Sequence, residues 1–306
     1  MKATLSGTSG LAAALACVLS LCAAAAAQPK KGSELEAKVR ALVAESGAET
    51  VAVAFRDLQT GRELMLNPGV SFHAASTMKV PVMLELYREA GAGELTLDAR
   101  LPVRNEFESI ADGSTFSVSP EDDSEQTLYR KIGGTETVRE LMRLMITESS
   151  NLATNVLVER VTPERVMRLM RSMGARDIRV LRGVEDGKAF EKGLNNTTTA
   201  RDLLVLLRAV AEGRAVSRAA SREMAEVLAA QKFNEGIPAG LPSGTRVAHK
   251  TGSITKHEHD AGIVYLSGRK PYVLVVLVRG IAEAPRAHKL IADISRAVYE
   301  SLGPAR

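Results

Sequence analysis

The sequence contains no tryptophan, and its only two cysteines, Cys17 and Cys22, both stand close to the N-terminus. The segment that holds them has Lys2 as its only charge, an apolar run "LAAALACVLSL", and small residues up to Ala27. This pattern predicts a signal peptide over residues 1–27, because the apolar run is too short for a membrane span. Lipid attachment at Cys22 is disfavoured by the large residue before it.

Cleavage of the leader leaves residues 28–306 with neither a thiol nor a disulfide, so the fold must depend on a packed core. We expect the mature protein to be periplasmic or secreted, without stable membrane insertion. Loss of Lys2 lowers the formal net charge from +4 to +3. Aromatic residues make up 4% of the chain, and basic residues alternate with acidic ones. Since no basic, aromatic-rich patch is present, we expect no nucleic-acid partner.

Strand patterns occur near both ends of the mature chain. A helix is predicted over 33–46, followed by strands over 50–57 and 62–67. Further strands are predicted from residue 245 on, and the apolar run "YVLVVLVRGI" at 272–281 indicates a central, buried strand. A closing helix is predicted over 285–302.

About 120 residues between these strand regions are mostly helical in pattern. Thr137 and Glu140 form a capping box, and Pro163 opens a helix that Gly174 ends. We therefore predict an α+β fold, in which an antiparallel sheet is flanked by terminal helices and an all-helical lobe is inserted. The predicted boundaries are an α/β lobe at about 34–75 and 212–306 and a helical lobe at about 76–211.

The stretch "ASTMKVP" places Ser76 three residues before Lys79 at the start of a predicted helix. Residues i and i+3 share a helix face, so the Lys79 amine can reach the Ser76 hydroxyl. A serine with an adjacent base is a candidate nucleophile. The alternative interpretation is a capping serine followed by a solvated lysine.

Two further polar motifs follow along the chain. "SSN" places Ser149, Ser150 and Asn151 in a turn between two helices, where such residues are also common as caps. "HKTGS" lies on a predicted strand and places Lys250 and Thr251 before a glycine, at which a ligand can approach the backbone closely.

In this order, "STMK", "SSN" and "KTGS" resemble the motif set of class A β-lactamases and penicillin-binding proteins. The resemblance covers essentially the whole mature chain. It implies a monomeric serine hydrolase that opens small-molecule β-lactams through an acyl-enzyme, with no metal and no cofactor. The same resemblance permits two alternatives: a D-alanyl-D-alanine peptidase or penicillin-binding protein that stays acylated, and a catalytically weak cleft-binding domain.

The resemblance also implies catalytic roles. Ser76 is expected to attack the lactam carbonyl, Lys79 to help remove its proton, and Ser149 to relay a proton to the departing nitrogen. A carboxylate must then activate water. Glu191 begins an "EKGLN" phrase typical of the family, whereas Glu185 has the better register and leaves a loop of nearly usual length. We favour Glu185, and both glutamates remain candidates.

Substrate-binding roles follow from the same resemblance. Asn151 is expected to hold the amide side chain of the substrate, while Lys250 and Thr251 bind its carboxylate. The backbone N–H groups of Ser76 and Ser253 are expected to form the oxyanion hole.

The sequence departs from the family pattern at several positions. Ser150 stands where an aspartate usually braces the turn, and Asn196 replaces an aspartate that usually pairs with a loop arginine, so we expect that loop to be held less firmly. No arginine is evident near Ala261. His257 and His259 share a strand face, which is compatible with a metal, but a solvated strand end is favoured.

The segment at 105–134 is longer and more acidic than the usual connection in the family. We expect it to shape the rim of the cleft, and the sequence assigns it no further role.

Overall fold

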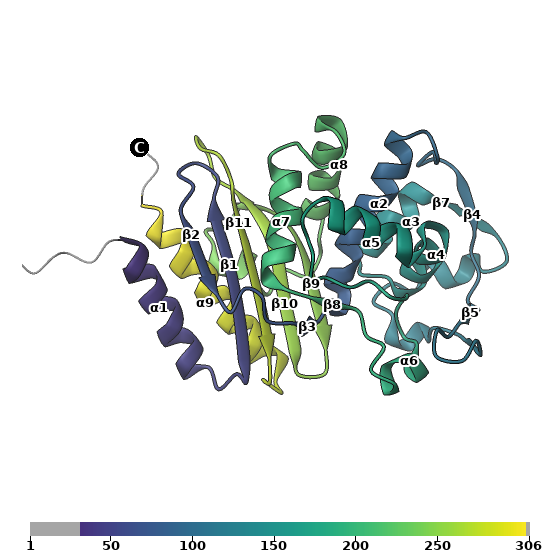
Figure 1. Ribbon diagram of the computed structural model, residues 1–306, viewed down its shortest axis with the longest axis horizontal. Helices are drawn as coiled ribbons and strands as arrows, with labels where there is room; N and C mark the ends of the chain where they lie inside the picture. The colour runs from purple at the N-terminus through teal and green to yellow at the C-terminus, as the bar shows by residue number, and fades with distance from the viewer. Residues whose placement is uncertain (1–30, 304–306) are drawn as a thin grey trace, which may run out of the picture.

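Five antiparallel strands form the main sheet: β1 (Thr50–Asp57), β2 (Glu63–Leu66), β9 (Arg246–Ile254), β10 (His257–Tyr265) and β11 (Tyr272–Arg279). Their order is β2-β1-β11-β10-β9, so strands from both ends of the chain share one sheet (Figure 1). The computed structural model describes residues 31–303. The predicted signal peptide, residues 1–27, lies outside the described residues.

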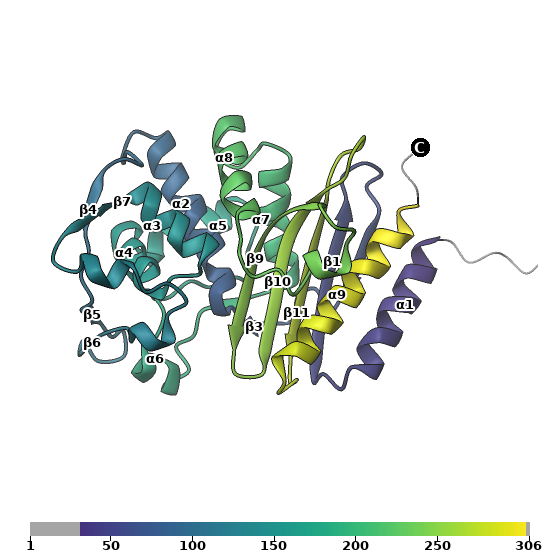
Figure 2. The same ribbon diagram turned by 180° about the vertical axis from the view of Figure 1, so that it is seen from behind.

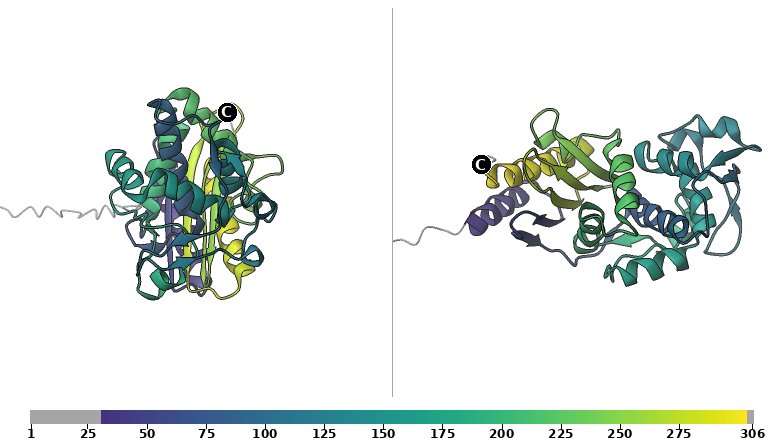
Figure 3. Two further views of the ribbon diagram at one scale, coloured as in Figure 1. Left: turned by 90° about the vertical axis from the view of Figure 1, so that its right-hand side faces the viewer. Right: turned by 90° about the horizontal axis from the view of Figure 1, so that it is seen from above.

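The central strand β11 is buried on both faces. Leu274 and Val276 pack into the cluster formed with the terminal helices α1 (Lys31–Glu45) and α9 (Ala284–Ser301). The alternate residues of β11 join a second cluster with α7 (Ala200–Ala211) on the opposite face (Figure 3). Burying each such side chain contributes about 1.5–3 kcal/mol. The continuous apolar run thus becomes a central strand, as predicted.

The remaining longer helices gather beside the sheet (Figure 2). These helices are α2 (Lys79–Gly91), α3 (Val138–Thr147), α4 (Asn151–Val161), α5 (Pro163–Ser172) and α8 (Arg218–Ala229), with the short α6 (Gly187–Glu191). The predicted capping box forms at the start of α3, where the Thr137 hydroxyl accepts a hydrogen bond from the Glu140 backbone N–H at 3.2 Å.

Three two-stranded sheets complete the described strands. They pair β3 (Phe72–His73) with β8 (Thr197–Thr198), β4 (Arg100–Pro102) with β7 (Thr135–Thr137), and β5 (Phe107–Glu108) with β6 (Thr115–Phe116). The predicted α+β class is confirmed, and the lobe boundaries remain predictions. Within residues 31–303, no helix combines the length and apolar character needed to cross a membrane.

Candidate active site

The strand β9 passes very close to η1, the 3₁₀ turn Ala75–Met78 that leads into α2. A Cβ atom added to Gly252 on β9 would lie 3.2 Å from both the Ser76 nitrogen and the Ala74 oxygen. Only glycine fits this approach without displacing backbone. The third motif is therefore held directly against the first.

Ser76 follows a strained residue. Ala75 has φ of +44°, a conformation that is rare for a residue other than glycine and that clusters at functional sites. The Ala75 N–H donates to Nδ1 of His73 at 3.0 Å, which holds the turn. Ser76 is left half-buried and lines the adjoining cavity.

Lys79 lies fully buried one helical turn after Ser76. Its Nζ donates to the Ser149 carbonyl at 2.7 Å, to the Ser149 hydroxyl at 3.2 Å and to Oδ1 of Asn151 at 3.0 Å. Among the hydrogen bonds of residues 31–303, none joins this amine to the Ser76 hydroxyl. Burial lowers the pKa of Lys79 to about 7, although the carboxylates of Asp123 and Glu185 oppose the shift. The amine can therefore accept a proton near neutral pH.

The Ser149 hydroxyl lies between two lysines. Lys250, fully buried on β9, donates to this hydroxyl at 3.1 Å and to the Thr251 carbonyl at 3.1 Å. Burial has the largest effect on Lys250 and holds its pKa well below the ordinary value. Repulsion by the nearby Lys79 lowers this pKa further. Ser149 itself has φ of +59°. All three motifs thus meet around one hydroxyl group.

The structure separates the two candidate glutamates. Glu185 lines the same cavity as Ser76, and its Oε1 accepts a hydrogen bond from Nδ2 of Asn151 at 3.3 Å. Burial raises the pKa of Glu185, and Asp122 adds to the effect. Glu191 is exposed at the end of α6 and is absent from the cavity linings that contain Ser76.

Two adjoining cavities of about 370 and 330 Å³ form the cleft. Both are lined by Ser76, Asn151, Glu185 and Ser253, and the larger also by Thr251. Apart from the alternative Glu191, each predicted site residue therefore either lines the cleft or, as with the two lysines, touches a residue that does.

The Ser253 side chain is engaged at the edge of this cleft. Its hydroxyl donates to Oε1 of Glu258 at 2.7 Å, and Oε2 of Glu258 lies 3.0 Å from Nε2 of His288 on α9. Hydrogen bonding to Glu258 raises the pKa of His288. The side chain of Ser253 is thus turned to Glu258, so only its backbone N–H remains a candidate oxyanion donor.

The expectation that the second motif lacks a bracing carboxylate is wrong. Asp123, from the acidic segment, occupies that role in space: its Oδ2 accepts hydrogen bonds from the backbone N–H groups of Asn151 and Leu152 at 2.9 Å each. Ser150 instead caps α4, because its hydroxyl accepts from the Ala153 N–H at 3.2 Å. The sequence signal for Asp123 was only the excess of acids in its segment.

The loop that carries Glu185 is held by hydrogen bonds to the neutral side chain of Asn196 and not by an ion pair. The buried Asn196 amide oxygen accepts from the backbone N–H groups of Leu181 and Arg182 at 2.8 and 3.2 Å, and its nitrogen donates to the Arg182 carbonyl at 3.0 Å. With a further bond from the same nitrogen to the Gly183 carbonyl at 3.4 Å, four neutral hydrogen bonds stand where the family's usual ion pair is missing.

Asn155 on α4 fixes the next part of this loop. Its side chain donates to the Val184 carbonyl at 3.0 Å and accepts from the Val184 N–H at 2.6 Å. A Cβ atom on Gly183 would lie 2.2 Å from the Asn155 oxygen, so any larger residue there would displace the amide that holds Val184. No pattern in the sequence marks Asn155, because an asparagine within a helix is usually solvated.

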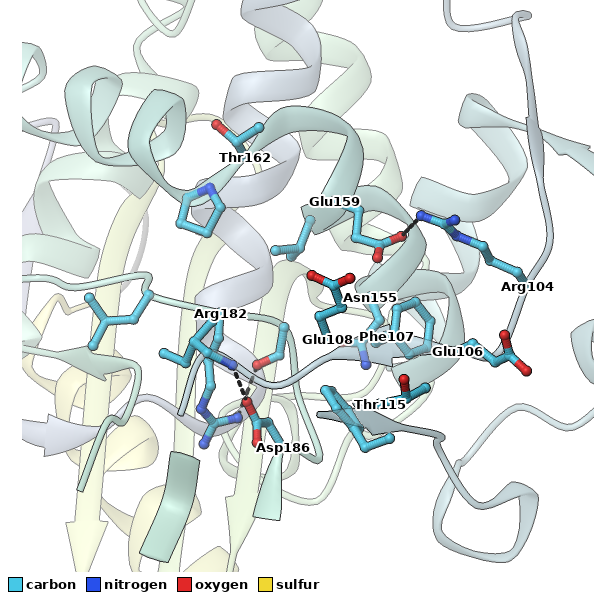
Figure 4. Close-up of a pocket in the computed structure, with 16 residues that line it drawn as sticks. Arg104, Glu106, Phe107, Glu108, Thr115, Asn155, Glu159, Thr162, Arg182 and Asp186 are labelled. Carbon is cyan, nitrogen blue, oxygen red and sulfur yellow. Dashed lines mark hydrogen bonds and ion pairs between the residues drawn. The ribbon is translucent and has the colours of Figure 1, made fainter. Parts of the chain in front are cut away.

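The acidic segment also holds the Glu185 loop. Asp186, buried beside Glu185, accepts from the Ser109 hydroxyl at 2.8 Å and from the Ile110 N–H at 3.1 Å. Asp186 and Arg182 line the smaller half of the cleft and also a neighbouring cavity of about 540 Å³, whose lining contains none of the predicted site residues (Figure 4). This cavity is larger than either half of the cleft, but the nucleophile and the buried lysines are not part of it.

The prediction of a solvated strand end at the two histidines is wrong for His259. This ring is buried, donates from Nε2 to the His73 carbonyl at 2.9 Å, and accepts at Nδ1 from the Val278 N–H at 3.3 Å. Burial lowers the pKa of His259 to about 4. With both nitrogens engaged, it is not available to a metal, and no group of three metal-ligating side chains occurs in the described chain.

An α+β fold that holds a serine, two buried lysines and a carboxylate around one cleft belongs to the class of serine acyl-transfer enzymes. The chain is a member of the β-lactamase enzyme family, whose model matches residues 34–302. The predicted resemblance to class A β-lactamases is therefore confirmed, as is the prediction of an enzyme of this type.

Individual relatives agree with this assignment. A β-lactamase of Streptomyces albus G is 28% identical over 276 residues, which cover 89% of this chain and 85% of that protein. An ancestral class A β-lactamase is similar in structure with a TM-score of 0.75 and 27% identity, covering 87% of this chain and 99% of the other. The structure of PBP-A is similar with a TM-score of 0.77 and 27% identity, covering 88% and 96%.

Proposed function

We propose that this protein is an exported serine β-lactamase that hydrolyses β-lactams through an acyl-enzyme at Ser76. The observation that carries the proposal is the Ser149 hydroxyl, which accepts hydrogen bonds from both buried lysines while Ser76 and Glu185 line the same cleft. Export depends on the predicted signal peptide, and the mature protein acts as a monomer in the periplasm or outside the cell.

Acylation begins when the Ser76 oxygen attacks the lactam carbonyl carbon and its proton passes to the Lys79 amine. The pKa of about 7 supports this role, because burial keeps part of the Lys79 population neutral. The C–N bond of the lactam then breaks, and the nitrogen takes the Ser149 proton. Lys79 returns a proton to Ser149 across their 3.2 Å contact.

Deacylation uses Glu185 as the base. The carboxylate removes a proton from water, the resulting hydroxide attacks the ester carbon, and the ester C–O bond breaks as Glu185 returns that proton to the departing Ser76 oxygen. The position of Glu185 in the lining of the cleft and its raised pKa support this assignment over Glu191. The hydrogen bond from Asn151 orients the carboxylate.

The other predicted residues bind the substrate. Asn151 holds its amide side chain, and Lys250 and Thr251 bind its carboxylate. The backbone N–H groups of Ser76 and Ser253 stabilise the oxyanion, as the close packing of β9 on η1 supports. No metal or cofactor is needed for these steps.

Intact-mass spectrometry of the mature protein, mixed over time with a penicillin and a cephalosporin, tests the proposal. We expect a transient adduct at the mass of the intact drug and accumulation of drug increased by one water. A stable adduct without product would favour the D-alanyl-D-alanine peptidase or penicillin-binding protein. Reversible binding without an adduct would favour a cleft-binding domain.

Replacing Lys250 by alanine is expected to weaken recognition of the substrate carboxylate. A hydrogen bond to a charged group contributes about 1.5–3 kcal/mol, so kcat/KM should fall about 10- to 100-fold, mainly through KM and slower acylation. Steady-state kinetics with carboxylate-bearing substrates measure the change. Lys270→Ala, at an exposed lysine between β10 and β11, is the matched control. Unaltered kinetics in Lys250→Ala would make the third motif structural.

A further inference from the structure

Asp123 is an almost fully buried carboxylate, 4% exposed, in the segment that the sequence left without a function. Its Oδ1 accepts a hydrogen bond from the Glu125 N–H at 3.1 Å. Its Oδ2 faces the second motif and accepts bonds from the Asn151 and Leu152 N–H groups (2.9 Å each), the Tyr129 hydroxyl (3.0 Å) and the Ser150 hydroxyl (3.3 Å). Because hydrogen-bond donors surround this buried carboxylate, it is a structural part of the protein and not a solvated loop acid.

We propose that Asp123 is a positioning residue for acylation: it holds the "SSN" turn from outside the motif and thereby fixes Lys79. This inference rests on the proposed function, because it assigns Lys79 the task of accepting the Ser76 proton. Within the described chain, no hydrogen bond joins Asp123 to Ser76 or to Lys79. Asp123 therefore acts on Lys79 indirectly, through the "SSN" turn that it holds.

The turn needs such a support. Ser149 has φ of +59°, and a non-glycine residue in this region persists only where its surroundings fix it. The same turn supplies all three acceptors of the Lys79 amine, two from Ser149 and one from Asn151. The Asp123 bonds to the Asn151 and Leu152 N–H groups hold the first residues of α4, where a negative charge is also favoured. A shift of this turn therefore displaces the amine from Ser76.

Asp123 also contributes charge. Three charged groups face Lys79. The carboxylates of Asp123 and Glu185 favour its ammonium form. Lys250 opposes that form, because the two amines repel each other, and this repulsion also lowers the pKa of Lys250. Burial has the largest effect and favours the neutral amine. Removing the Asp123 charge should thus move the Lys79 titration to lower pH, an effect that a merely structural cap would not produce.

Asp123→Asn tests the proposal, because it keeps the size of the side chain and loses the charge. A second variant, Asp123→Ala combined with Ser150→Asp, moves the carboxylate to the adjacent position within the motif. Glu121→Gln is the matched control, since Glu121 is an exposed acid two residues away on the same segment. The measurements are the acylation rate from intact mass, the melting temperature, and the Lys79 titration followed by NMR of protein labelled at lysine Cε.

We expect Asp123→Asn to acylate about 100-fold more slowly, as misplacement of a reacting group by about 1 Å does. Its Lys79 titration midpoint should fall, while Glu121→Gln matches the unmutated protein in both measurements. The variant with the relocated carboxylate should recover most of the acylation rate and the Lys79 midpoint.

An unmoved Lys79 midpoint in Asp123→Asn overturns the proposal, whether or not the rate falls, because loss of rate with lower melting temperature alone describes a structural cap. An unchanged acylation rate overturns it as well. The unmutated protein in the same series tests the proposed function separately: absence of any β-lactam adduct there refutes that function, and the NMR titration still decides whether Asp123 controls Lys79.

Discussion

Ser76→Ala is expected to abolish covalent labelling by every β-lactam while leaving the fold intact. The alanine removes the only atom that can form the ester with the lactam carbonyl, and no other hydroxyl replaces it, because Ser149 is held by the two lysines. Ser76 is half-buried and the substitution leaves no large void, so the free energy of unfolding should change by less than about 1 kcal/mol.

Intact-mass spectrometry with penicillin and cephalosporin measures this prediction, and thermal unfolding provides the check on the fold. Ser253→Ala is a suitable comparison, since it removes a hydroxyl that also lies at the cleft but donates to Glu258. That variant should still be labelled. If the Ser76→Ala protein still acquires the mass of the drug, Ser76 is not the nucleophile.

Glu185→Gln is expected to acylate normally and then to accumulate the acyl-enzyme. The glutamine keeps the size of the side chain and an oxygen that can accept the 3.3 Å hydrogen bond from Asn151, but it cannot take a proton from water. Loss of a general base typically slows a step about 10²- to 10⁴-fold, so the lifetime of the adduct should increase within that range. Time-resolved intact mass measures this lifetime directly.

The pH dependence of deacylation offers a second measurement. Burial and the neighbouring Asp122 raise the pKa of Glu185 above the ordinary glutamate value. Deacylation requires the ionised carboxylate, so its rate should fall as pH drops through this raised pKa. The acidic limb of the profile should disappear in Glu185→Gln.

Glu191→Gln is the matched control for this prediction, because Glu191 is exposed and belongs to the same loop region. It should turn over β-lactams nearly as the unmutated protein does. A long-lived adduct in Glu191→Gln with normal turnover in Glu185→Gln would reverse the assignment. An equally stable adduct in the unmutated protein would instead indicate a penicillin-binding protein.

Several features of this protein follow from the sequence alone. The stretch around Ser76 and Lys79 predicts the start of a helix, and η1 does lead directly into α2 there. The apolar run of β11 predicts a strand buried on both sides, as the structure bears out. The capping box at Thr137 is equally local. These features are readable because each depends on residues a few positions apart, whose geometry is set by helix or strand periodicity.

Other features were decided only by tertiary structure. Glu185 and Glu191 lie six positions apart in similar polar surroundings, yet only the path of the loop brings one of them into the cleft. Asp123 braces a turn 28 residues further along the chain, and His259 is buried against a backbone carbonyl 186 residues away. Burial and hydrogen-bond partners such as these arise when distant segments pack together, so the local periodicity of the sequence does not predict them. They set which carboxylates, amines and imidazoles carry charge.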